Sequence, residues 1–177
     1  VLSNLIVRPA PGYIQVGKTT LSPKKIDIAG PKEELALINH VETIFDTLIG
    51  TTTPTKGYLD IATSGRLIEY SENEVEINLD IQEISERIIV DIPIRVINIP
   101  NNIRVFPSPQ TVSLTVVGGV QHIARLNPED IQVVINFNSW NRQIQFYEPQ
   151  VNIPSDIIEW RDISPRSLEL GVAREVQ

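Results

Sequence analysis

SPKKIDI, residues Ser22–Ile28, is the first of four related segments in this chain. The others are SPQTVSL at Ser108–Leu114, SPRSLEL at Ser164–Leu170, and a weaker copy, SENEVEI at Ser71–Ile77, in which Glu replaces Pro. Proline has no N–H to give to a strand ladder and favours a turn or the start of a strand. The alternating apolar residues that follow send one set of side chains to a core and the other set to solvent. Each segment therefore predicts a turn that leads into a short strand.

A second frame, Pro-x-x-apolar-x-apolar, precedes each of these segments. Its copies are PGYIQV at Pro11–Val16, PNNIRV at Pro100–Val105, the close variant PSDIIEW at Pro154–Trp160 and the weak variant SGRLIEY at Ser64–Tyr70. The combined pattern of strand, turn and strand thus occurs four times, in two pairs. We predict two tandem domains, residues 1–84 and 85–177, each made of two similar halves, with the boundary near Ile84–Arg87.

Each predicted domain also carries one short helical insertion. Residues Gly30–Ile38 place proline and acidic residues where a helix begins, and Gly118–Leu126 space apolar residues three apart. A strand is expected after each insertion, at Val41–Leu48 and at Ile131–Phe137, and then a loop, at Gly50–Gly57 and at Asn138–Arg142. Ile and Val account for 44 of the 177 residues, against 19 for Leu and Ala, which favours strands over helices. The predicted fold class is mainly β with one short helix per domain.

Composition excludes several kinds of partner and site. The net charge is −7, so phosphate backbones and anionic lipid surfaces would be repelled. The chain has no Cys, which excludes disulfides and cysteine-bound zinc, and no Met, which suggests a piece of a longer protein. The most apolar run, Ile88–Ile99, is interrupted by Asp91, Pro93 and Arg95 and is not expected to span a bilayer.

Residues Gly12–Thr19, GYIQVGKT, match the string of a phosphate-binding loop. Such a loop needs a helix that starts at its lysine, so that backbone N–H groups point at the phosphates. Here Tyr-Ile-Gln-Val has the alternation of a strand, and Ser22-Pro23 follows where the helix should run. We therefore predict a strand and a turn rather than a nucleotide site.

The remaining titratable residues do not form a recognisable catalytic pattern. His40 and His122 lie near the ends of the two helical insertions, without partners at metal-ligand spacing. Glu72, Glu74 and Glu76 alternate, which predicts three carboxylates on one solvated strand face. No Gly-x-Ser-x-Gly turn is present for a nucleophile. We predict no catalytic, cofactor-binding or metal-binding residues, and no enzymatic activity.

Aromatic residues gather in the second predicted domain. Trp140 lies in a polar, hairpin-like segment, and we take Trp140, Asn141 and Arg142 as the candidate contact with a partner. Trp160 lies on an alternating strand and is expected in the core. Neighbouring aromatics, Phe137, Phe146 and Tyr147, leave open a second possibility, a carbohydrate-binding platform.

The repeated pattern resembles the YbbR-like domain family. Ile26–Gly30 (IDIAG) and Val112–Gly118 (VSLTVVG) look like the V-x-V-x-G element of that family, although the second copy carries extra residues before its glycine. Ser164–Leu170 looks like the closing strand of such a domain. The resemblance covers nearly the whole chain as two tandem copies.

The resemblance implies a role and a location, but no catalytic residues. YbbR-like domains occur in tandem on the extracytoplasmic side of bacterial membranes, behind an N-terminal transmembrane anchor that would lie outside this chain. The best-known members regulate a membrane-bound diadenylate cyclase and hence cyclic di-AMP synthesis. The expected function is therefore a non-catalytic regulatory module that binds a protein partner, without cofactors and without nucleic acid. The alternative is a β module that binds envelope polysaccharide or another carbohydrate.

Overall fold

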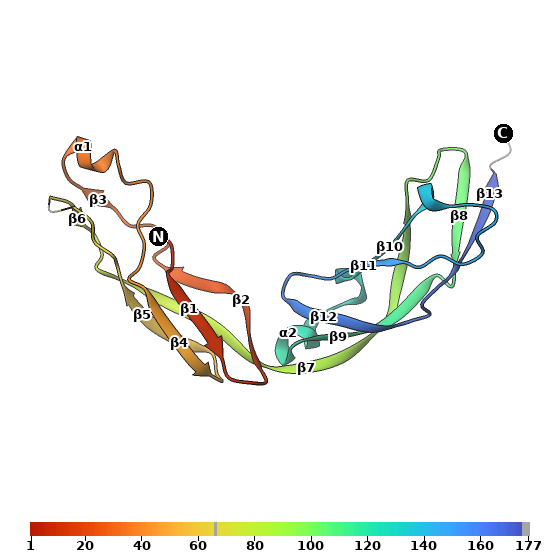
Figure 1. Cartoon of the computed structure of the whole chain (residues 1–177), viewed down its shortest axis with the longest axis horizontal. Coiled ribbons are helices and arrows are strands. Elements are labelled where there is room, and N and C mark those ends of the chain that lie inside the picture. The colour runs from red at the N-terminus through yellow and green to blue at the C-terminus, as the bar shows by residue number, and fades with distance from the viewer. Residues whose placement is uncertain (66, 175–177) are drawn as a thin grey trace. The chain divides into compact units, whose positions relative to one another are not determined.

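The computed structural model describes residues 1–65 and 67–174, with Arg174 described by its backbone only. Contacts divide the chain into unit 1, Val1–Ile84, and unit 2, Ser85–Gln177. Both units are mainly β, and the described part of each holds one short α-helix, α1 at Lys32–Leu35 and α2 at Val120–Arg125 (Figure 1). The predicted fold class is confirmed.

Unit 1 is built from three groups of paired strands. Its strands are β1 (Leu5–Pro9), β2 (Tyr13–Ser22), β3 (Ile28–Ala29), β4 (Asp46–Thr51), β5 (Thr55–Asp60), β6 (Glu69–Tyr70) and the first part of β7 (Glu74–Ile97). β1 and β4 are parallel, β3 and β6 are antiparallel, and β7 is flanked by β2 and β5, both antiparallel to it. Strand β7 therefore has both of its edges paired in this unit.

The core of unit 1 lies along β7. The residues Val75, Ile77, Leu79 and Ile81 are buried, whereas the alternate positions Asn78 and Asp80 are exposed. The buried row packs against residues of β1, β2, β4 and β5 in one cluster. The period of two that the sequence shows in this segment thus decides which face of the strand is inside.

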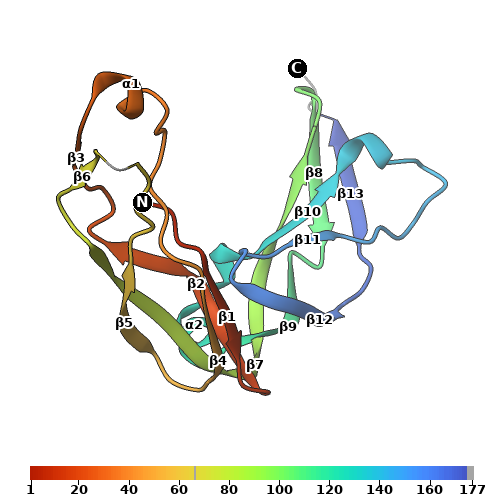
Figure 2. The same cartoon turned by 60° about the vertical axis from the view of Figure 1, so that its left-hand side comes forward.

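Unit 2 begins with the second part of β7. It continues with β8 (Ile103–Ser108), β9 (Thr111–Gly119), the 3₁₀ turn η1 (Pro128–Asp130), β10 (Gln132–Asn136), the 3₁₀ turn η2 (Phe137–Ser139), β11 (Gln150–Asn152), β12 (Ile157–Ser164) and β13 (Glu169–Arg174). The strand order is β11-β10-β7-β9-β12, and β8 and β13 form a separate antiparallel pair, seen side by side in Figures 1 and 2. A second buried cluster, which includes Ile92, Leu114, Val116 and Val133, fills this unit.

The two units repeat the same pairings. The parallel pair β1–β4 corresponds to β7–β10, the pair β2–β7 to β8–β13, and the pair β3–β6 to β9–β12. Registers agree as well, because Ser22 faces Glu76 and Ser108 faces Glu169. The three Ser-Pro bonds, at Pro23, Pro109 and Pro165, are all cis. Each Ser-Pro segment and the weak copy after Ser71 lead into a strand, although β3 begins only at Ile28; in the weak upstream copy, whose Arg66 lies outside the described residues, the strand is limited to Glu69–Tyr70.

The glycine of each V-x-V-x-G element lies where another segment approaches closely. A Cβ on Gly30 would stand 2.9 Å from the carbonyl oxygen of Leu67, and one on Gly118 would stand 2.9 Å from Cγ2 of Ile123 in α2. Neither glycine has a positive φ, so close approach rather than backbone conformation requires the missing side chain.

Several predicted boundaries were wrong. The strand predicted at Val41–Leu48 is interrupted, because Thr43 is buried and pairs with Ile61 while Phe45 turns outward, so β4 starts only at Asp46. The second predicted strand ends at Asn136, and Phe137 begins η2.

The predicted loop at Gly50–Gly57 is mostly strand. Gly50 adopts a φ of +74° at a register shift, which lets β4 continue to Thr51, and β5 resumes at Thr55. The second predicted loop, Asn138–Arg142, starts inside η2.

The string that resembles a phosphate loop lies mostly within strand β2. Gly17, with a φ of +72°, sits at the register shift between Val16 and Thr20, so the Gly-Lys pair marks an irregularity in a ladder. The prediction that three carboxylates share one face was wrong for Glu72, which precedes β7; Glu74 and Glu76 lie on the strand. None of the described helices is long and apolar enough to cross a membrane.

Candidate functional site

The described residues hold no group of three or more His, Asp or Glu side chains arranged to bind a metal. The two histidines lie in different units, His40 after α1 and His122 within α2. His40 is exposed and its Nε2 lies 2.9 Å from Oε1 of Glu42. This exposed pair has no serine or threonine hydroxyl bonded to it, so the described residues offer no activated nucleophile here.

Glu42 belongs to a polar clamp that holds the first residues of the chain. The Nδ2 of Asn4 donates to Oε2 of Glu42 at 2.9 Å and to the carbonyl of Thr43 at 3.2 Å. The backbone N–H of Asn4 donates to Oγ1 of the buried Thr43 at 3.0 Å. The bond from Asn4, followed by that from His40, lowers the pKa of Glu42 below its ordinary value. The clamp thus joins the residue just before β1 to the segment that precedes β4.

Titration of Glu42 should follow from this clamp. Because its folded pKa is lowered, its contribution to stability is present above the ordinary carboxyl pKa and is lost as the pH falls through the lowered one. Asn4→Ala is expected to move the pKa of Glu42 back toward its ordinary value, measured by NMR of the side-chain carboxyl. Asn39→Ala, which removes an exposed amide nearby, is the control and should leave the pKa unchanged. An equal pKa of Glu42 in Asn4→Ala and in the parent protein would contradict the explanation that the clamp lowers this pKa.

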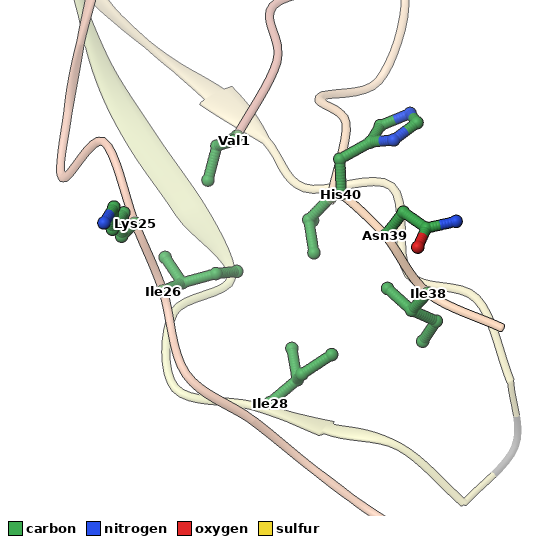
Figure 3. Close-up of a pocket in the computed structure, with 8 residues that line it drawn as sticks. Val1, Lys25, Ile26, Ile28, Ile38, Asn39 and His40 are labelled. Carbon is green, nitrogen blue, oxygen red and sulfur yellow. The ribbon is translucent and has the colours of Figure 1, made fainter. Parts of the chain in front are cut away.

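Beside the clamp lies an open cavity of about 230 Å³, lined by Val1, Lys25, Ile26, Ile28, Ile38, Asn39, His40 and Val41. Figure 3 shows the side chains of Ile26, Ile28 and Ile38 directed toward its interior. The imidazole of His40 and the amide of Asn39 point away from it (Figure 3). The cavity thus combines an isoleucine-lined interior with polar residues at its border, and the polar groups of His40 and Asn39 do not converge on it.

The predicted partner contact lies at the end of β10, where η2 leads into an irregular segment. Trp140 is half-buried: its ring stacks on the buried Phe137, with 5.4 Å between centroids and 11° between planes. One face of the indole is therefore used within the unit. Asn141 and Arg142 are exposed. Trp160, predicted in the core, is also half-buried and packs against the unit 2 cluster.

Residues Asn141–Tyr147, which we call the tip, are closed by the phenol of Tyr147. Its hydroxyl accepts from the N–H of Asn141 and donates to the carbonyl of the same residue, both at 2.9 Å. The N–H of Ile144 donates to the carbonyl of Asn141 at 3.0 Å. The tip is thus a loop that these hydrogen bonds hold closed, although it lacks regular secondary structure.

The tip presents two apolar side chains: Ile144, which the sequence interpretation did not name, and Phe146, which it named only for a carbohydrate-binding platform. Ile144 is 48% exposed and Phe146 is 57% exposed, next to the polar Asn141 and Arg142. The exposure of Phe146 could have been predicted, because side chains alternate in direction along an extended segment and the adjacent Tyr147 is buried. An exposed apolar pair with a polar border is typical of a protein contact.

Comparison with known proteins finds one similar solved structure and no sequence match. Neither a protein-family model nor a curated protein matches the chain. The chain is similar to the crystal structure of a YbbR-like protein from Streptococcus pneumoniae TIGR4, with 12% identity and a TM-score of 0.39. The alignment covers 97% of this chain and 91% of the other.

Proposed function

We propose that this chain is a non-catalytic interaction module, made of two YbbR-like domains, that binds a protein partner and regulates it. The observation that carries the proposal is the tip of unit 2. A loop fastened at Tyr147 offers Ile144 and Phe146 to solvent, and this costs less ordering on binding than a flexible loop would. At the cavity of unit 1, by contrast, the imidazole of His40 and the amide of Asn39 point away from the interior (Figure 3).

The identity of the partner and the compartment rest on the resemblance of the sequence repeat. In the YbbR-like family, the best-known members act on a membrane-bound diadenylate cyclase, from outside the cytoplasm and behind a membrane anchor. We propose the same arrangement here, with contact to the membrane only through an anchor outside this chain. The net charge of −7 supports a protein partner over nucleic acid or an anionic lipid surface.

Co-expression tests this function directly. The cognate diadenylate cyclase, expressed with the full-length protein, should produce a different level of cyclic di-AMP than the cyclase alone. The double variant Ile144→Ser/Phe146→Ser should abolish that difference because it removes the apolar contact. Ile158→Ser changes a similarly exposed apolar residue on β12 and should leave the difference intact. An unchanged cyclic di-AMP level with the parent protein would contradict regulation of the cyclase.

Two further measurements separate this role from other classes. The purified protein should show no turnover of ester, phosphate or glycoside substrates, and sustained turnover would contradict a non-catalytic role. Trp fluorescence should not change across a panel of glycans, because the Trp140 indole already stacks on Phe137. A saturable change would instead support the carbohydrate-binding alternative.

A further inference from the structure

Strand β13 has one paired edge and one open edge. Its residues Glu169–Arg174 pair with β8, and Leu168, just before it, forms an isolated bridge with Tyr147. In that bridge the N–H and the carbonyl of Leu168 both bond to Tyr147, at 3.0 and 2.9 Å. Backbone groups alternate in direction along a strand, so Leu170 and Val172 also direct their N–H and carbonyl groups away from β8.

Unit 1 shows which kind of strand pairs with the equivalent edge. The shared register of the Ser-Pro turns makes Val75, Ile77 and Leu79 of β7 the counterparts of Leu168, Leu170 and Val172. In unit 1 these three positions face Leu59, Gly57 and Thr55 of β5, which completes a third strand. Unit 2 makes only the first of these three pairings, between Tyr147 and Leu168.

The tip explains why the described part of unit 2 supplies no third strand to the open edge of β13. Continuation of the pairing would place Gln145 opposite Leu170, but the chain instead closes on the hydroxyl of Tyr147. The side chain of Gln145 still reaches β13, where its Nε2 donates to Oε1 of Glu169 at 2.7 Å. Beyond Leu168, the described chain therefore supplies no strand to the outer edge of β13.

The surroundings of the edge indicate what it would accept. Phe106 of β8 faces Gly171, the residue between Leu170 and Val172, and is 52% exposed, so an aromatic side chain lies next to this part of β13. The exposed carboxylate of Glu169 favours a positively charged neighbour. A second copy of the chain would carry the same net charge of −7 and would be repelled.

We propose that the outer edge of β13, at Leu170 and Val172, binds an extended, basic segment of a partner protein as an added antiparallel strand. The segment resembles β5 in pattern: a small residue faces Leu170, and a Lys or Arg lies within reach of Glu169. This inference rests on the proposed function, because it names the element through which the module would hold its partner.

Amide hydrogen exchange of the full chain tests the proposal with a defined probe. The probe is a capped peptide with the sequence of residues 51–57, TTTPTKG, which carries one positive charge and stops before the residue that would face Leu168. In the protein without peptide, the amides of Leu170 and Val172 should exchange much faster than those of Gly171 and Ala173, which bond to β8. Millimolar peptide should slow exchange at Leu170 and Val172 by about tenfold or more, as expected for newly bonded amides.

Two variants of Val172 give the matched comparison. Val172→Pro removes the outward N–H but leaves the bonds to β8, so it should abolish peptide binding while thermal unfolding confirms that the protein is folded. Val172→Ala shortens the side chain but keeps the N–H, and it should bind the peptide. Equal binding by the two variants, or no protection by the peptide in the parent protein, would overturn the proposal.

Two other outcomes of the exchange experiment would also overturn the proposal. If the amides of Leu170 and Val172 are as well protected as that of Gly171 in the absence of peptide, the edge is already occupied and the proposal is overturned. Protection that grows with protein concentration alone would assign the edge to a second copy, which overturns a basic partner. Failure of these tests leaves the cyclic di-AMP and turnover measurements untouched, so the edge and the proposed function stand or fall separately.

Discussion

Leu79→Ala is expected to lower the free energy of unfolding of unit 1 by about 2–5 kcal/mol. Leu79 is 0% exposed and lies at the centre of the row of buried side chains along β7, between β2 and β5. Truncation removes apolar contacts on both sides and leaves a cavity that neighbouring strands, fixed by their ladders, can only partly close. Chemical denaturation of the parent and the variant, monitored by circular dichroism, measures the difference.

The control for this substitution is Ile49→Ala. Ile49 belongs to β4 of the same unit and is 73% exposed, so its truncation should change the free energy of unfolding by about 0.5 kcal/mol or less. Equal losses in the two variants would show that the buried row along β7 is not the core of unit 1.

Gly118→Ala is expected to destabilise unit 2 by about 1–3 kcal/mol, although it adds only one methyl group. The new Cβ would stand 2.9 Å from Cγ2 of Ile123, a buried residue of α2 that has no free space to move into. Helix α2 starts two residues after Gly118, so a shift of the helix would strain the chain where it leaves β9. The melting temperature should fall accordingly.

Gly171→Ala provides the comparison, because Gly171 also lies on a strand of unit 2. Its nearest contact for a new Cβ is the carbonyl oxygen of Phe106 at 3.5 Å, an ordinary distance. The substitution should leave stability unchanged or raise it by up to about 1 kcal/mol, by restricting the unfolded chain. A loss at Gly171 as large as that at Gly118 would contradict the explanation by close approach.

The repeat of turns and strands was predictable because its signals are local. A proline after Ser ends one strand ladder, whether its peptide bond is cis or trans. The alternation of apolar and polar residues after it indicates which face of the strand is buried, even when the partner strand is not known. The Val41–Leu48 strand was mispredicted for the opposite reason. Its apolar residues do not alternate, and the burial of Thr43 depends on Asn4, which lies far away in sequence.

Less of the candidate site could be predicted than of the fold. The tip attracted notice through Trp140, yet the structure stacks that indole on Phe137 and exposes Ile144 and Phe146 instead. The closure of the tip depends on a hydroxyl that bonds a residue six positions earlier, a contact without a sequence signature. The open edge of β13 is invisible in sequence, because it is defined by a pairing that unit 1 makes and unit 2 omits.

Strand β7 serves both units: its residues up to Glu83 pair within unit 1, and those from Ile94 pair with β10 in unit 2. Because β7 runs from Glu74 to Ile97 without a break, protein engineers who wish to produce either half alone have few places to cut. A break between Ile84 and Ser85 leaves each fragment with all the ladder partners that it uses. A break ten residues earlier would take Val75, Ile77, Leu79 and Ile81 from the core of unit 1, and a break ten residues later would take Ile89, Ile92 and Ile94 from the core of unit 2.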